Sequence, residues 1–346
     1  MSGFVHALFY TILVGTGVIS GILSLPNEVK TERTPFHELE IIESDVGTSA
    51  LEEMPEVFAQ SFYEMPESRV TVFRTQNNTV EEMELEEYVE GVMLAEMPSW
   101  YGDEALRAAS VAVRTYTVYK MKNSSHSKNA KLCDNPSHCQ AFYKAEDAVA
   151  VWSEESTNKA VDRIKAAVKA TEGKILIYEN EPILAVYHAS SYLITRSSSE
   201  VFGGEMAYLQ SVSVPFEDKE NTRFSEKSYN KKAFEEILLR ESGYKCIDSY
   251  KTVWEKNKCM GIEVVSGDES KIIPSSRART LFSLASGSFE FEVKDGEILF
   301  YVYGYGHGVG LSQQGAGILA ERGWRWEEIV LHYYKNAEIA NLKFCE

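Results

Sequence analysis

The sequence predicts an α+β fold in which helices and β-hairpins mix along one large domain. Apolar residues from Leu85 to Met93 recur at helical spacing and form one face over two turns. Residues 289–293 and 298–303 flank an Asp-Gly pair, which predicts a β-hairpin. A mixture of helices and hairpins is typical of α+β architectures, and residues 69–346 are expected to form this domain.

The first element in chain order is an uncharged run at residues 4–25. As a helix it would be roughly 33 Å long, which matches a bilayer core of about 30 Å. The run is preceded by no Lys or Arg, whereas a cleaved signal peptide has a basic start. We therefore expect residues 1–25 to anchor a single-pass membrane protein; the alternatives are a cleaved signal peptide and a buried core helix.

Residues 26–68 contain eleven acidic and two basic residues, so a flexible acidic stalk is expected there. The whole chain has a net charge of -17, with 52 acidic and 35 basic side chains. Binding to nucleic acid requires a basic surface, so this balance argues against a nucleic-acid partner.

The domain itself is expected to begin with a short strand at residues 70–73. The helix that starts near Leu85 follows, and it should end near Met97 because Pro98 disfavours a helical residue before it. Asp103 can cap a second helix over residues 104–120. Arg107 and Arg114 are seven residues apart on this otherwise small and apolar helix, so they share one face. They should face a polar cleft or an acidic partner, or else simply reach solvent.

Residues 175–178 and 183–188 predict two strands around a Glu-Asn-Glu-Pro turn. The polar stretch 217–260, with one helix near 233–240, predicts an inserted lobe at 217–272. After the hairpin, glycine occupies every second position from 304 to 310, a helix starts at about Ser312, and a helix at 326–334 is expected to end the core.

Three segments, at 85–116, 188–212 and 304–334, closely resemble the stage II sporulation protein D family, and the resemblance extends over residues 70–343. It implies a membrane-anchored lytic transglycosylase outside the cytoplasm, which cleaves peptidoglycan glycan strands during forespore engulfment. It also implies two partners, stage II sporulation proteins P and M.

The family's catalytic glutamate matches Glu96, which lies where a helix ends, next to Ala95 and Met97. An apolar setting raises the pKa of a carboxyl group, so Glu96 can stay protonated and donate to a glycosidic oxygen. In a lytic transglycosylase the 6-hydroxyl of the sugar attacks, and one glutamate can act first as acid and then as base. The alternative is a surface glutamate near a helix end.

The resemblance also suggests residues that bind the glycan. These are Arg107, Arg114, His188, His307, Ser312 and Gln313. Arginines suit the carboxylates of muramyl stem peptides, and the glycine-rich segment can approach a ligand closely. His307 is expected to bind substrate or orient Glu96, or else to be a buried histidine with satisfied hydrogen bonds. Ser190-Ser191-Tyr192 departs from the family's Ser-Gly-Gly pattern, and a Ser–His hydrolase would need a Gly-x-Ser-x-Gly motif, which is missing.

Two thiols and two imidazoles lie within fourteen residues, at His126, Cys133, His138 and Cys139. Sulfur with imidazole is the donor set that zinc prefers. Some family members have zinc in this loop, which supports a structural zinc site here, with His188 as an alternative fourth ligand. A Cys133–Cys139 disulfide is the other interpretation.

The remaining cysteines are Cys246, Cys259 and Cys345, and a Cys246–Cys259 disulfide is a further expectation. Two other functions remain open. The domain also resembles amidase enhancers, which would make it a wall-binding module that assists another enzyme without cutting glycan. A zinc hydrolase is the third hypothesis.

Overall fold

The computed structural model describes residues 61–345, apart from 125, 150–153 and 215. The predicted anchor at 1–25 and residues 26–60 of the predicted stalk lie outside the described residues. Within the part that is described, none of the helices combines the length and apolar character needed to cross a bilayer.

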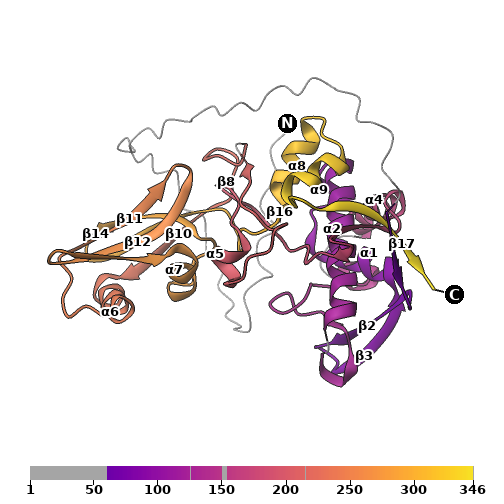
Figure 1. Cartoon of the computed structure of the whole chain (residues 1–346), viewed down its shortest axis with the longest axis horizontal. Helices are drawn as coiled ribbons and strands as arrows, with labels where there is room; N and C mark the ends of the chain where they lie inside the picture. The colour runs from indigo at the N-terminus through magenta and orange to yellow at the C-terminus, as the bar shows by residue number, and fades with distance from the viewer. Residues whose placement is uncertain (1–60, 125, 150–153, 215, 346) are drawn as a thin grey trace. The chain divides into compact units, whose positions relative to one another are not determined.

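The larger core is built around one central helix (Figure 1). Its helices are α1 (Leu85–Glu96), α2 (Asp103–Asn123), α4 (Glu154–Ala170), α8 (Gln313–Glu321) and α9 (Trp326–Tyr333). Helix α2 contacts the other four, and its alanines, valines and threonines are buried along most of its length. As predicted, α1 ends before Pro98, with Met97 in an extended conformation. Helix α2 begins at Asp103, with Gly102 rather than Asp103 as its N-cap, and it continues three residues beyond the predicted end.

A four-stranded sheet with the order β1-β17-β5-β6 lies against these helices. Its strands are β1 (Ser61–Met65), β17 (Glu338–Phe344), β5 (Lys174–Tyr178) and β6 (Glu181–Pro182). The stalk boundary at residue 68 is therefore too late, because Ser61–Met65 pair in parallel with β17. The expectation that residues 326–334 end the core is also wrong, because β17 follows α9 and pairs with both β1 and β5.

A second sheet, with the order β3-β2-β4, supports the segment that contains the cysteines. It consists of β2 (Arg69–Arg74), β3 (Thr79–Glu84) and β4 (Leu132–Cys133). Strand β2 matches the predicted strand at 70–73. Its parallel pairing with β4 aligns Phe73 with Cys133.

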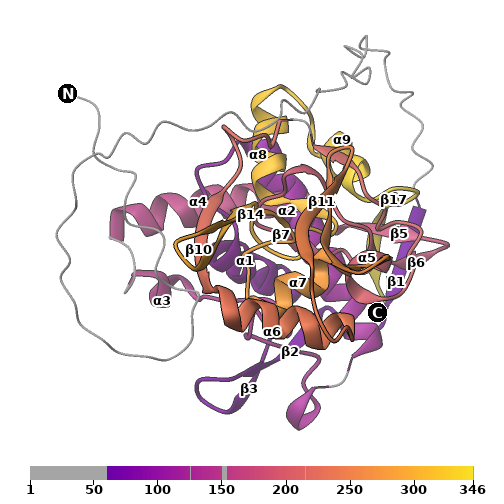
Figure 2. The ribbon, with the colours of Figure 1, turned by 90° about the vertical axis from the view of Figure 1, so that its left-hand side faces the viewer.

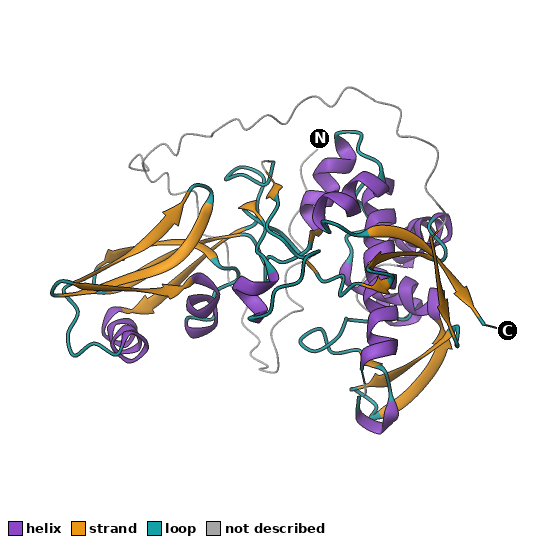
Figure 3. Ribbon diagram, viewed as in Figure 1, coloured by secondary structure: helices purple, strands orange, loops and turns teal. Residues whose placement is uncertain are grey.

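The lobe has its own apolar core, which contains four phenylalanines and several aliphatic residues. Its elements are β10 (Phe224–Asn230), α6 (Lys231–Ser242), β11 (Ser249–Glu255), β12 (Lys258–Ser266), β13 (Glu269–Pro274), α7 (Ser275–Leu281), β14 (Ser288–Lys294) and β15 (Glu297–Tyr303). They form two sheets, β10-β15-β14 and β11-β12-β13, and α6 and α7 lie along one side of the strands (Figures 2 and 3).

The predicted lobe boundary at residue 272 is too early. The hairpin β14–β15 forms around the Asp-Gly turn as predicted. However, its Phe289 and Phe300 complete the lobe's core, so the lobe extends to residue 303. Arg196 connects the lobe to the rest of the domain, because its guanidinium donates to the carbonyls of Cys259 (2.7 Å) and Gly287 (2.9 Å).

The remaining elements are short. They are η1 (Ser127–Asn129), α3 (Ala145–Val149), β7 (Tyr187–His188), β8 (Leu193–Ile194), α5 (Ser198–Phe202), β9 (Ser213–Val214) and β16 (Leu311–Ser312). The predicted strand at 183–188 is reduced to Tyr187–His188, because Ala185 and Val186 donate to carbonyls two residues earlier instead of to a ladder. Strand β7 pairs in parallel with β16, and His188 is aligned with Ser312.

Candidate functional site

Glu96 is the last residue of α1 and is half-buried. Its Oε1 accepts a hydrogen bond of 2.6 Å from the backbone N–H of Ala141. The hydroxyl of Tyr187 also hydrogen-bonds to the carboxyl group. Removal from water outweighs both hydrogen bonds and raises the pKa of Glu96 to about 7. The carboxyl group can therefore both donate and accept a proton near neutral pH.

Two glutamines connect Glu96 to distant segments. Gln313, at the start of α8, donates from Nε2 to the carbonyl of Glu96 at 3.1 Å. Gln140 donates to the Tyr187 hydroxyl at 2.9 Å. The fold therefore brings Glu96 together with Gln313, which was predicted to bind the glycan, and with Tyr187, which no motif indicates.

The glycine-rich segment packs against the chain itself. A Cβ at Gly310 would lie 2.0 Å from the Val186 carbonyl oxygen, and one at Gly306 would lie 2.8 Å from the Cβ of His188. Both glycines also have positive φ angles, of 71° and 111°. These glycines therefore allow two backbone segments to approach each other closely, and not a ligand as was expected from the sequence.

His188 and His307 are held neutral by their surroundings. His188 is buried, with Nδ1 donating to the Val309 carbonyl (3.1 Å) and Nε2 accepting from the Ser191 hydroxyl (2.6 Å). Burial lowers the pKa of His188 to about 3 and that of His307 to about 4. His307 accepts from the Val309 N–H at 3.0 Å and hydrogen-bonds to the carbonyl of Tyr187. His307 therefore contacts the backbone of Tyr187, whose side chain hydrogen-bonds to Glu96, and its proposed role in orienting Glu96 stays a prediction.

Ser312 has a structural position, which corrects its assignment as a substrate-binding residue. It is fully buried, caps α8 by accepting from the Gly315 N–H, and donates to Glu217 Oε1 at 2.8 Å. Glu217 also accepts from the Ser191 N–H at 2.9 Å. Burial raises the pKa of Glu217 to about 7. No sequence motif marks this second buried carboxyl, which lies in a polar stretch of the chain.

The two arginines of α2 have different surroundings. Arg114 is fully buried and forms a two-pronged ion pair with Glu86, with nitrogen–oxygen distances of 2.6 and 2.7 Å. Its remaining hydrogen bonds go to the carbonyls of Lys174 and Val168. The acidic partner that the sequence predicts is therefore present, but the substrate-binding assignment of Arg114 is wrong, because no face of its guanidinium reaches solvent. Arg107 is half-buried and pairs with Glu104, one turn earlier.

A cluster of thiols and imidazoles lies beside the site. One ligand atom from each of His126, Cys133 and His138 lies within 4.8 Å of the others. His138 Nδ1 is 3.6 Å from the Cys133 sulfur and 3.2 Å from the Cys139 sulfur. Both thiols are free, so the alternative disulfide is not formed. His188 has its own partners, as described above, and is not part of this cluster.

The cluster is coupled to Glu96 through the chain and through two tyrosines. Cys139 directly precedes Gln140 and Ala141, which contact Tyr187 and Glu96. Burial raises the pKa of both Tyr88 and Tyr116, and negative charge at the cysteines and at Glu96 raises it further, so the two phenols lie near both groups. In the sequence, only the position of Gln140 and Ala141 directly after Cys139 could have indicated that they contribute to the site.

The expected Cys246–Cys259 disulfide is wrong, because both thiols are free. Cys259 is buried in the lobe, with its sulfur 3.6 Å from the carbonyl of Phe289, while Cys246 is exposed beside Ser266. The strand pattern of β12 directs Cys259 into the lobe's core.

Comparison with known proteins bears on this geometry. The family model described as "Stage II sporulation protein" matches residues 74–178, which include Glu96 and the thiol–imidazole cluster. Stage II sporulation protein D of Bacillus amyloliquefaciens is 32% identical over 274 residues, 78% of each chain. Its namesake in Bacillus subtilis (strain 168) is 31% identical over 274 residues, again 78% of each chain. The chain belongs to the stage II sporulation protein D family.

This sporulation family membership confirms the resemblance identified from the three sequence segments. A more distant relative is the amidase enhancer of Bacillus subtilis (strain 168), which is 26% identical over 304 residues, 73% of this chain and 40% of that protein.

Proposed function

We propose that this stage II sporulation protein D family member is a lytic transglycosylase that cleaves peptidoglycan glycan strands, with Glu96 as the catalytic acid and base. The observation that carries the proposal is the half-buried Glu96 carboxyl, whose pKa burial raises to about 7. The Ala141 N–H and the Tyr187 hydroxyl hold this carboxyl in place and stabilise its charged form.

The reaction needs one group that gives a proton and later takes one back. Protonated Glu96 donates its proton to the glycosidic oxygen, the bond from that oxygen to the muramyl C1 breaks, and the next sugar leaves with a free hydroxyl. The muramyl O6 then bonds to C1 while the Glu96 carboxylate accepts the proton of the 6-hydroxyl. The product has a 1,6-anhydro end, no water is consumed, and the carboxyl group returns to its protonated form.

A zinc ion is proposed at His126, Cys133, His138 and Cys139. Sulfur and imidazole nitrogen are the donors that zinc prefers, and the three mutually close ligand atoms with the adjacent Cys139 sulfur fit this set. When bound, zinc would cross-link the loop structurally. Gln140 and Ala141 follow this loop, and they would then be held firmly against Tyr187 and Glu96.

The family relationship supports three further proposals on cellular context. The chain is anchored in the cell membrane by residues 1–25, with the domain outside the cytoplasm, where peptidoglycan lies. The reaction serves forespore engulfment during sporulation. Stage II sporulation proteins P and M are the proposed protein partners.

The second candidate function is that of a wall-binding module, which the likeness to an amidase enhancer favours.

One assay separates the enzyme from the wall-binding module. The full-length chain is incubated with glycan strands that lack stem peptides, and the products are examined by mass spectrometry. Anhydro-muramyl ends that disappear with Glu96→Gln support the enzyme, with Glu87→Gln on the exposed side of α1 as the control. No cleavage, together with stimulation of a separate amidase, supports the module. New reducing ends that chelation abolishes would indicate a zinc hydrolase.

A further inference from the structure

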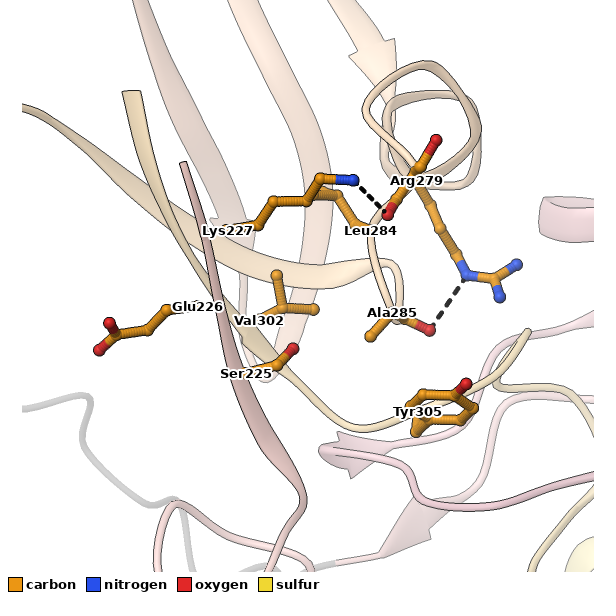
Figure 4. Close-up of a pocket in the computed structure, with 9 residues that line it drawn as sticks. Ser225, Glu226, Lys227, Arg279, Leu284, Ala285, Val302 and Tyr305 are labelled. Carbon is orange, nitrogen blue, oxygen red and sulfur yellow. Dashed lines mark hydrogen bonds between the residues drawn. The ribbon is translucent and has the colours of Figure 1, made fainter. Parts of the chain in front are cut away.

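The lobe contains a pocket of about 310 Å³ where β10 meets the loop after α7 (Figure 4). Its lining residues are Ser225, Glu226, Lys227, Arg279, Ser283, Leu284, Ala285, Val302 and Tyr305. Glu96 is not among them. The pocket therefore belongs to a different part of the molecule from the carboxyl group described above.

Two cations line the pocket. Arg279 is half-buried at the end of α7, and its Nε donates to the Ala285 carbonyl at 3.3 Å. Among the described residues, no carboxylate pairs with Arg279, and its two terminal nitrogens have no hydrogen-bond partner. Lys227 donates to the Ser283 carbonyl at 3.0 Å and likewise has no acidic partner in the described part of the chain. The aromatic side of the pocket is Tyr305, with the Arg223 guanidinium 4.7 Å from the centre of its ring.

The acidic residue in the lining faces away from these cations. Side chains alternate along a strand, so Ser225 and Lys227 of β10 share one face and Glu226 occupies the other. Figure 4 shows the Glu226 carboxylate pointing away from Arg279 and Lys227. In a chain with a net charge of -17, this pocket thus concentrates positive charge that no acid of its lining neutralises. Burial of Arg279 lowers its pKa, and a bound anion would offset that cost.

The pocket is connected to Glu96 by a short series of contacts. Burial lowers the pKa of both His188 and His307, and the positive charge of Arg279 lowers both further, so the guanidinium lies in their neighbourhood. His307 hydrogen-bonds to the carbonyl of Tyr187, whose hydroxyl meets the Glu96 carboxyl. Arg279 and Glu96 are thus linked through His307 and Tyr187.

We propose that Arg279 and Lys227 form a subsite that binds a carboxylate of the glycan substrate. This inference rests on the proposed function for its ligand, because muramyl residues carry carboxylates. The carboxylate has two possible sources. One source is the lactyl group, whose carboxylate is free in strands without stem peptides and is converted to an amide in strands that carry them. The other source is a carboxylate of the stem peptide itself. A planar guanidinium with two unpartnered terminal nitrogens suits two-pronged binding of either carboxylate.

The test measures binding to the full-length chain with Glu96→Gln, so that the ligand stays intact. Three tetrasaccharides are compared by calorimetry: one with free lactyl carboxylates, one with these converted to methyl amides, and one with stem peptides attached. Arg279→Gln is expected to weaken binding about tenfold for a ligand that carries the recognised carboxylate, and to leave the methyl amide unaffected. Loss only with the first ligand identifies the lactyl group, and loss only with the third identifies the peptide.

Matched variants make the test decisive. Arg277→Gln is the control, since Arg277 lies on the same helix but is exposed and paired with Glu241. It should change no affinity, and Arg279→Lys should restore part of the lost affinity. If Arg279→Gln fails to fold, Lys227→Gln decides, with the same expected direction. Equal losses with all three ligands, or no loss with any, would overturn the subsite. A wild-type chain that cuts no glycan but shows the Arg279-dependent binding would refute only the cleavage proposal.

Discussion

Replacing the buried Glu217 by glutamine is expected to stabilise the protein at alkaline pH. Glu217 Oε1 accepts from Ser312 and from the Ser191 N–H, while Oε2 has no partner among the described atoms. Burial raises the pKa of Glu217 from 4.5 to about 7. A glutamine can keep both accepted hydrogen bonds. Its amide nitrogen can donate to the Tyr333 hydroxyl, which is likewise buried without a partner in the described structure.

The size of the effect follows from the difference between the folded and unfolded pKa values. Because the folded pKa is the higher one, the folded state binds more protons between pH 4.5 and 7. Stability is therefore greatest below pH 4.5 and is lost as the pH rises through 7. At pH 8 the buried charge of Glu217 lowers the free energy of unfolding by about 3 kcal/mol, because each unit between the unfolded pKa of 4.5 and the folded pKa of about 7 corresponds to about 1.4 kcal/mol. Glu217→Gln should recover up to this amount at pH 8 and almost nothing at pH 4.5.

Urea unfolding of the full-length chain at both pH values measures this difference. Glu87→Gln, at an exposed position, should leave the free energy of unfolding unchanged at either pH. Glu217→Gln should also retain glycan cleavage and Glu96→Gln should abolish it, although burial raises both pKa values to about 7. A Glu217→Gln variant that is equally destabilised at both pH values would show that the buried charge of Glu217 does not limit stability.

Three further predictions concern the surroundings of Glu96. Arg114→Met should lower the free energy of unfolding, measured in urea, by about 3 kcal/mol, because it leaves Glu86 without its buried partner. Glycan affinity should stay unchanged. Reduced affinity without loss of stability would contradict this prediction. Tyr187→Phe removes a hydrogen bond that lowers the pKa of Glu96. In the pH profile of the cleavage rate, the alkaline limb should therefore move to higher pH by up to about one unit. An unchanged pH profile would count against the contact between Tyr187 and Glu96. Cys139→Ser should reduce the zinc content measured in the purified protein and lower its melting temperature, and equal zinc content would remove the cysteine from the site.

Local patterns were enough to predict many elements of the fold. The end of α1 before Pro98, the start of α8 at Ser312 and the hairpin around Asp295-Gly296 all depend on neighbours within a few residues. By contrast, the pairing of β1 with β17 joins strands about 280 residues apart, and no local pattern indicates it. The lobe boundary was missed for the same reason, because its core closes only when Phe289 and Phe300 pack onto it.

The candidate site shows the same division. Motif resemblance identified Glu96, and the thiol–imidazole spacing identified the cluster at Cys133 and His138. The surroundings that raise the pKa of Glu96 include Tyr187, which comes from another segment and could not be read from the residues around position 96. Arg114 shows the opposite limit, since its motif position suggested substrate but its burial against Glu86 makes it structural.

The titration of the Glu96 carboxyl decides whether this group holds a proton that it can donate at neutral pH. In the full-length chain with ¹³C-labelled glutamate, the Glu96 resonance is assigned by its absence from Glu96→Gln and followed from pH 4 to pH 9. The account predicts a midpoint near the pKa of about 7 that burial produces. A midpoint at the ordinary value of 4.5 would show a solvated carboxylate that holds no proton to donate at neutral pH, and would contradict the account.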